Sequence, residues 1–225
     1  MIADPTAQGR GIPYRFMSTP AFVYFRSDEA LLKLVQVAGP KPGGEIKPLL
    51  PLLLELAFCR AVDNYLMYVS DLLALIFKTR PKAMAASKET VPLEMVLRYD
   101  SYDDLLNAIT EQKVLTLSFM GMLKLNEHMN NHWKFPLFQD SDSLNKAVTI
   151  VETRNLFVHN RGIISNRFVE RVPGYAGKVG DHLTIPPDIL ADYFNFLQKA
   201  VLDTDHRAHL KFDISQKQPV FGDAT

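Results

Sequence analysis

Apolar residues recur at helical spacing along most of this chain. Between Pro48 and Lys78 they return every three or four positions, which predicts one long helix that begins after a proline. A second long helix is predicted from Ser101 towards Asn130, because two aspartates follow the serine and apolar residues continue at the same spacing. The core stripe expected for the first helix consists of Leu52, Leu56, Cys59, Val62, Leu66, Val69 and Leu73.

The helix with the clearest predicted ends runs from about Ser143 to Arg161. Capping residues precede its first leucine, and Gly162 follows its end. Single helical turns are expected around Leu93–Leu97 and in NRFVERV, and PPDILADYFNFLQKAVL predicts a last helix. The segment PGYAGKVGDHLTI has a glycine-rich opening and a short alternating tail, which fits a loop or a small hairpin. These patterns predict an all-α fold of the helical-bundle type.

Prolines and glycines divide the chain into three expected parts. The segment GPKPGGE cannot continue a helix, so residues 1–46 are expected to form an amino-terminal arm with a helix starting near Ser27. Residues 47–205 would form the helical bundle, and residues 206–225 a carboxyl-terminal tail.

Composition narrows the function classes. The 25 basic and 25 acidic residues balance, so no overall field draws the protein to nucleic acid, and any phosphate-binding site must be local. Cys59 is the only cysteine, which excludes a disulfide framework and a thiol cluster for metal. We expect neither a metal nor another cofactor. Charged residues interrupt the apolar runs and no secretory signal is evident, so we expect a cytoplasmic protein that does not enter membranes.

Polar residues interrupt the Ser143 helix near its end, in the segment ETRNLFVHNRG. The residues that share one stripe of this helix are Leu144, Val148, Val151, Asn155 and His159. This stripe is apolar for two turns and then polar, so its last two side chains need hydrogen-bond partners, water, another subunit or a ligand. Arg154 lies about 140° around the helix from His159. Either the arginine reaches round the helix, or a second copy of the helix completes the site.

An arginine, an asparagine and a histidine together can support cleavage of RNA phosphodiesters. An imidazole titrates near neutrality, so His159 can take the proton of a 2′-hydroxyl or protonate the leaving oxygen. The guanidinium of Arg154 can hold the phosphate and offset charge that develops on its oxygens. Asn155 can orient the histidine or donate to the phosphate. None of these roles needs a metal ion.

The motif RNLFVHN resembles the HEPN superfamily. An arginine is followed directly by a polar residue and, after four intervening residues, by a histidine. The continuation RGIISNRFVERV and the earlier VDNYLMYVSDLLALIF, with Asp63 and Asp71, also look like this family, and the resemblance covers roughly residues 48–202. It implies a HEPN-type bundle and a homodimer in which the two motif helices meet.

The resemblance also implies metal-independent endoribonuclease activity on RNA, often in a toxin, phage-defence or stress-response setting. An antitoxin or another protein partner belongs to such a setting. Asp63 is then a candidate supporting residue, and Arg161 and Arg167, which flank the motif, are candidates for RNA contact.

Many proteins of this family bind RNA or nucleotides without cutting them. The alternative is therefore a non-catalytic HEPN dimer that serves as an RNA-binding, nucleotide-binding or protein-interaction module. A sensor of small molecules built on the same bundle is a third hypothesis. A nuclease needs His159 open to a shared cleft, whereas a scaffold can seal this histidine inside an interface.

Overall fold

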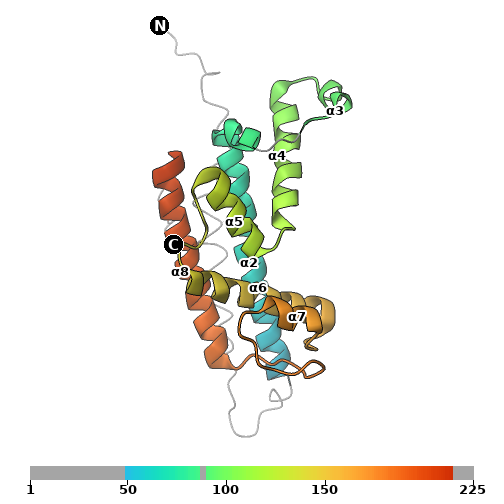
Figure 1. Cartoon of the computed structure of the whole chain (residues 1–225), viewed down its shortest axis with the longest axis vertical. Coiled ribbons are helices and arrows are strands. Elements are labelled where there is room, and N and C mark those ends of the chain that lie inside the picture. Colours follow the sequence, from blue (N-terminus) through green and yellow to red (C-terminus); the bar gives the residue numbers. More distant parts are fainter. Residues whose placement is uncertain (1–48, 87–89, 215–225) are drawn as a thin grey trace, which may run out of the picture.

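The computed structural model describes residues 49–86 and 90–214, and these form a bundle of helices (Figure 1). The described residues contain no strand, so the predicted all-α fold is confirmed. Each of the described helices is too short or too polar to span a bilayer. In chain order the helices are α2 (Leu50–Thr79), η3 (Pro81–Ala86, a 3-10 helix), α3 (Leu93–Leu97), α4 (Tyr102–Ser118), α5 (Met122–Trp133), α6 (Ser141–Asn160), α7 (Asn166–Arg171) and α8 (Pro187–Phe212).

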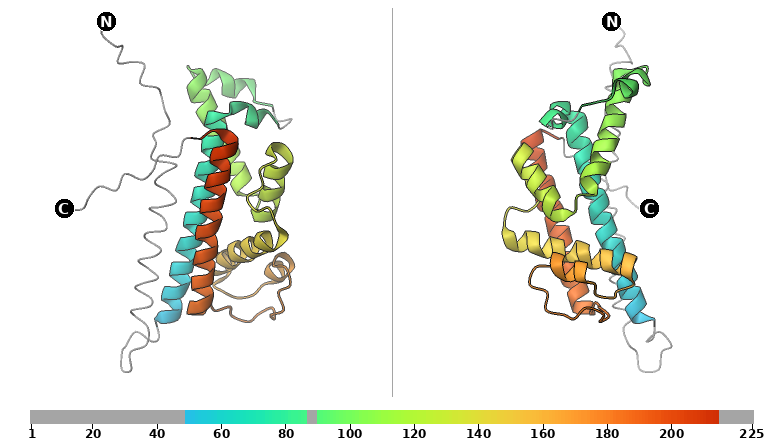
Figure 2. Two further views of the ribbon diagram at one scale, coloured as in Figure 1. Left: turned by 90° about the vertical axis from the view of Figure 1, so that its left-hand side faces the viewer. Right: turned by 45° about the vertical axis from the view of Figure 1, so that its right-hand side comes forward.

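Helix α2 is the centre of the bundle and contacts α4, α6 and α8. Helix α8 runs alongside α2, and α6 crosses this pair, with α7 packed on α6 (Figures 1 and 2). Phe58 of α2 joins these layers, because its ring centroid lies 6.0 Å from that of Phe157 on α6 and 5.8 Å from that of Tyr193 on α8. This aromatic contact fixes the motif helix against the core.

The predicted core stripe of α2 is wrong at its beginning. Leu52 and Leu56 are 51% and 57% exposed, whereas Leu54 and Phe58 are 5% and 1% exposed. The run LPLLLEL places leucines on several faces of the helix, so spacing alone could not choose the buried one. Further along, Val62 is buried, as predicted.

The single helix predicted from Ser101 towards Asn130 is instead two helices. Ser101 caps α4 as expected, since its hydroxyl accepts a hydrogen bond from the Asp104 amide at 3.1 Å. Helix α4 then ends at Ser118, and α5 begins at Met122. Gly121 adopts a φ of +80°, a conformation that side chains disfavour, and thereby turns the chain between the two helices.

Helix α6 has nearly the predicted bounds. The Asp140 carboxylate accepts a hydrogen bond from the Ser143 amide at 2.7 Å and caps its start. Arg161 and Gly162 end it with φ values of +54° and +76°. A Cβ on Gly162 would lie 2.9 Å from the ring of His182, an exposed side chain that can shift, so the positive φ is the main reason for glycine here.

The remaining expectations concern two short helices, the loop before α8 and the two ends of the chain. The predicted short helices correspond to α3 and α7. The glycine-rich segment before α8 is a loop rather than a hairpin, with one isolated antiparallel bridge between Ile163 and His182. Helix α8 continues through Phe212, into the segment expected to be a tail. The expected arm of residues 1–46, with its helix near Ser27, lies outside the described residues.

Candidate functional site

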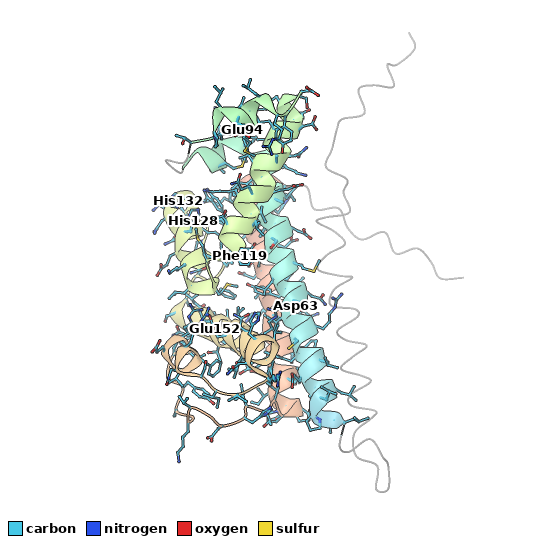
Figure 3. The ribbon with its side chains drawn as sticks, turned by 90° about the vertical axis from the view of Figure 1, so that its right-hand side faces the viewer. Asp63, Glu94, Phe119, His128, His132 and Glu152 are labelled. Carbon is cyan, nitrogen blue, oxygen red and sulfur yellow. The ribbon has the colours of Figure 1, made fainter. Side chains whose placement is uncertain are left out.

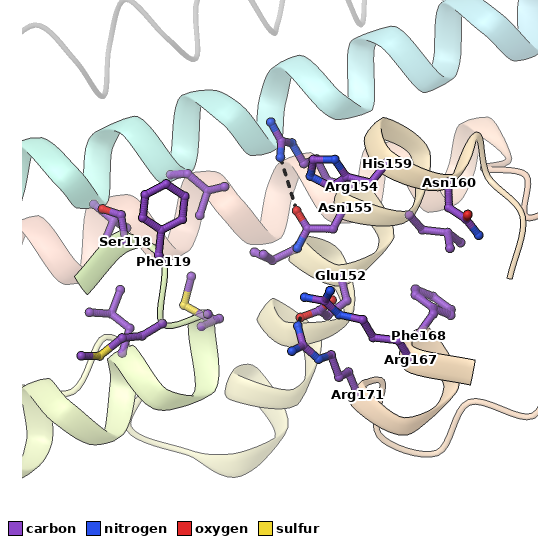
Figure 4. Close-up of a pocket in the computed structure, with 18 of the residues that line it drawn as sticks. Ser118, Phe119, Glu152, Arg154, Asn155, His159, Asn160, Arg167, Phe168 and Arg171 are labelled. Atoms are coloured by element: carbon purple, nitrogen blue, oxygen red, sulfur yellow. Dashed lines mark hydrogen bonds and ion pairs between the residues drawn. The ribbon is translucent and has the colours of Figure 1, made fainter. Parts of the chain in front are cut away.

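A cleft of about 600 Å³ lies where α2, α6, α7 and the α4–α5 turn meet (Figure 4). All three residues predicted to be catalytic line it: Arg154, Asn155 and His159. Across the cleft from Arg154 and Asn155 lie Ser118 and Phe119, at the end of α4. The other polar side chains that line the α6 and α7 wall are Glu152, Asn160, Ser165, Arg167 and Arg171.

Helix α6 directs its last polar residues into this cleft because its apolar residues are held in the core. Val151 and Leu156 are buried, whereas Asn155 is half-buried and His159 is exposed. Arg154 leaves the helix in a different direction from His159, yet both line the same cleft.

Arg154 is held by two neighbours. Its Nη2 lies 2.6 Å from Oδ1 of Asp63 on α2, in an ion pair. Its Nη1 donates a hydrogen bond to Oδ1 of Asn155 at 3.3 Å. Its Nε is buried and has no hydrogen-bond partner within residues 49–86 and 90–214. The guanidinium is thus oriented by two protein groups, and its Nε makes no hydrogen bond to them.

The predicted supporting residue, Asp63, lies beside the motif. Its carboxylate is 36% exposed and the side chain of Arg154 is 22% exposed, so the pair lies at the edge of the bundle rather than in the core. The contact connects α2 to α6 next to the cleft. Asp71, the second aspartate in the resemblance, is half-buried, which raises the pKa of its carboxyl, and it does not line the cleft.

The two arginines predicted to contact RNA are separated by the structure. Arg167 lines the cleft and has no ion-pair partner in the described part of the chain. Arg161 ends α6 and does not line the cleft. Arg171, which was not predicted from the sequence, also lines the cleft, and its Nη1 lies 3.2 Å from Oε1 of Glu152. Its spacing of four from Arg167 on α7 could have indicated it.

Cys59 lies near the motif but is not an activated thiol. Burial, with smaller contributions from Glu55 and Asp63, raises the pKa of its thiol to about 11, although Arg154 opposes this shift. The thiol therefore stays protonated at neutral pH. Among the described residues no cluster of three or more histidines, cysteines and carboxylates is arranged to hold a metal ion.

Comparison with protein-family models, with curated proteins and with solved structures finds no match to this chain.

Proposed function

We propose that this protein is a HEPN-like endoribonuclease that cleaves RNA phosphodiesters without a metal ion, at a composite site formed by a homodimer. The single observation that carries this proposal is that Arg154, Asn155 and His159 line one open cleft. A guanidinium, an amide and an imidazole that line one cleft can support such a cleavage, by holding the phosphate and by transferring a proton.

The proposed reaction starts from the 2′-hydroxyl next to the scissile phosphate. His159 takes its proton, and the oxygen attacks phosphorus while the bond to the 5′-oxygen breaks. The leaving oxygen receives a proton from a second imidazole, so the products are a 2′,3′-cyclic phosphate and a 5′-hydroxyl. Arg154 offsets the charge that develops on the phosphate oxygens, and Asn155 orients the guanidinium to which it is hydrogen-bonded.

The homodimer would supply the second imidazole. One described copy places a single histidine in the cleft, whereas the reaction needs a proton acceptor and a proton donor. The protein has no net charge to keep copies apart. Met67 on α2 and Val158 on α6 are exposed apolar side chains on the two helices that carry Asp63 and the motif. Association through these helices would bury them and bring two motifs together.

A second candidate function is a non-catalytic dimer that binds RNA, a nucleotide or another protein. The ion pair between Arg154 and Asp63 favours this candidate, because a guanidinium that is already neutralised is a weaker phosphate clamp. For the nuclease, the setting we propose is a cytoplasmic toxin or phage-defence system, in which an antitoxin or another protein would restrain the activity.

The test is incubation of purified protein with mixed cellular RNA in EDTA, followed by analysis of the product ends and of the oligomeric state. The nuclease proposal expects a dimer that produces 2′,3′-cyclic phosphate and 5′-hydroxyl ends. A folded dimer that binds RNA and leaves it intact would overturn catalysis in favour of the binding module. Loss of cleavage in EDTA, restored by magnesium, would overturn the metal-independent mechanism.

A further inference from the structure

The cleft has an aromatic side chain that the proposed chemistry does not use. Phe119 follows α4 directly and is 81% exposed, which makes it the most exposed large hydrophobic side chain among the described residues. It lines the cleft together with its neighbour Met120. Phe119, Asp63 and Glu152 lie in the same middle part of the molecule, well away from Glu94, although they come from three separate elements (Figure 3).

The backbone of the α4–α5 turn holds Phe119 in this position. Its amide donates hydrogen bonds to the carbonyls of Leu115 and Leu117, so its backbone is fixed to the end of α4. Gly121, two residues later, turns the chain into α5. The ring therefore stands on a rigid corner and not on a long loop, although it contributes little to the core.

Cationic side chains lie on the other wall of the cleft. Arg167 has no ion-pair partner within residues 49–86 and 90–214, and Arg154 keeps a buried Nε without a hydrogen-bond partner there. An apolar protein segment would bury Phe119 but would leave the Arg167 guanidinium without an anion, whereas Arg154 already pairs with Asp63. A ligand that has both a flat apolar face and a negative charge would cover Phe119 on one wall and pair with the arginine on the other.

We propose that Phe119 is the platform on which an unpaired base of single-stranded RNA stacks, while the adjoining phosphate lies against Arg154 and Arg167. This inference rests on the proposed function and adds to it the class of RNA. A base can stack on a phenylalanine only if it has left its own duplex, so the cleft selects single-stranded segments. Every base has a flat face, so the platform tolerates different sequences.

The test measures binding rather than cleavage. The probe is a fluorescent single-stranded RNA oligonucleotide with 2′-O-methyl groups throughout, which cannot be cut, and the same sequence as a duplex. The protein variants are Phe119→Leu, which keeps apolar area without an aromatic face, and Phe119→Trp, which keeps the aromatic face. Leu123→Ala is the matched control, because Leu123 is also exposed beside this turn but does not line the cleft.

We expect Phe119→Leu to weaken binding of the single strand at least about fivefold, the effect of losing one stacked base. Phe119→Trp and Leu123→Ala should bind like the parent, and the parent should bind the duplex more weakly than the single strand. Analytical ultracentrifugation should show the same dimeric state for the parent and all variants.

Two results would overturn the stacking role of Phe119 without overturning the proposed nuclease function. One is equal binding by the parent and Phe119→Leu while the parent cleaves RNA, and the other is equal binding of strand and duplex. If Phe119→Leu disrupted the dimer and left RNA binding unchanged, the ring would belong to a protein interface. Failure of the parent both to bind and to cleave RNA would overturn the proposed function together with the platform.

Discussion

The Arg154 guanidinium and the Asp63 carboxylate form an ion pair, with 2.6 Å between Nη2 and Oδ1, that connects the motif helix to the central helix of the bundle. Both side chains are partly exposed, and pairs of this kind typically contribute no more than about 1 kcal/mol to the free energy of unfolding. Their main effect should therefore be on the cleft, where the pair sets the direction of the guanidinium.

Replacement of Arg154 tests whether the arginine acts on RNA or only supports the fold. Arg154→Ala should lower kcat/KM for RNA cleavage at least about 100-fold, because the transition state loses the guanidinium that offsets charge developing on the phosphate oxygens. Its urea denaturation midpoint should change little. Arg98→Ala is the control, since Arg98 is an exposed arginine that does not line the cleft. Unfolding of Arg154→Ala, rather than inactivity, would indicate a structural arginine.

Replacement of Asp63 tests its supporting role. Asp63→Asn keeps the shape of the side chain and removes the negative charge that competes with phosphate for Arg154. We expect KM to fall, because RNA no longer displaces a carboxylate, and kcat to fall about tenfold, because the guanidinium is less well positioned. Steady-state kinetics on one oligonucleotide separate the two effects. Unchanged kcat and KM would show that Asp63 has no supporting role in cleavage.

Two buried tyrosines on α2 predict opposite effects on stability. Tyr65 Oη is buried without a hydrogen-bond partner among the described residues, whereas Tyr68 Oη donates to the Val201 carbonyl at 3.3 Å. At neutral pH, Tyr65→Phe should therefore raise the free energy of unfolding by about 1 kcal/mol, and Tyr68→Phe should lower it by about 1 kcal/mol. Urea denaturation of both variants measures the difference. A destabilised Tyr65→Phe variant would mean that its hydroxyl has a partner.

The same tyrosines set a pH dependence. Burial raises the pKa of Tyr65 and of Tyr68 above the ordinary value, so the folded state keeps protons that the unfolded state releases at alkaline pH. The stabilisation is complete below the ordinary tyrosine pKa of 10.0 and is lost progressively as the pH rises above it. Thermal denaturation between neutral pH and about pH 11 should show this fall, and Tyr65→Phe should reduce it. An unchanged slope in Tyr65→Phe would contradict the assignment.

Leu54 and Leu56 test the buried face of α2 with the same substitution. Leu54 is 5% exposed and Leu56 is 57% exposed. Leu54→Ala should lower the free energy of unfolding by roughly 2 to 5 kcal/mol, whereas Leu56→Ala should change it by about 0.5 kcal/mol or less. If urea denaturation showed that both variants lose the same free energy of unfolding, Leu56 would be buried in the core, as its spacing predicts.

Local signals predicted most helix ends. Asp140 and Ser101 cap the helices that follow them, because such caps depend on residues only three positions apart. The spacing of Asn155 and His159 likewise predicted that α6 would change from a buried to a polar stripe. Caps and stripes depend only on residues within one helix, so they can be predicted from local sequence.

Contacts between distant segments could not be predicted in this way. The pairing of Glu152 with Arg171 depends on how α7 folds back on α6, and the place of Phe119 depends on the break at Gly121. The pattern of apolar residues continues through that break, so it favoured one helix. The glycine was the only local signal of the corner that carries Phe119.

The role of His159 in cleavage is tested by the rate at which the parent, His159→Ala and His206→Ala cut RNA in EDTA. His206 is an exposed histidine on α8, outside the cleft, and serves as the matched control. We expect His159→Ala to slow cleavage roughly 100- to 10,000-fold, as loss of a general acid or base does. His206→Ala should cut at the parent rate. Equal rates for the parent and a folded, dimeric His159→Ala variant would contradict the account.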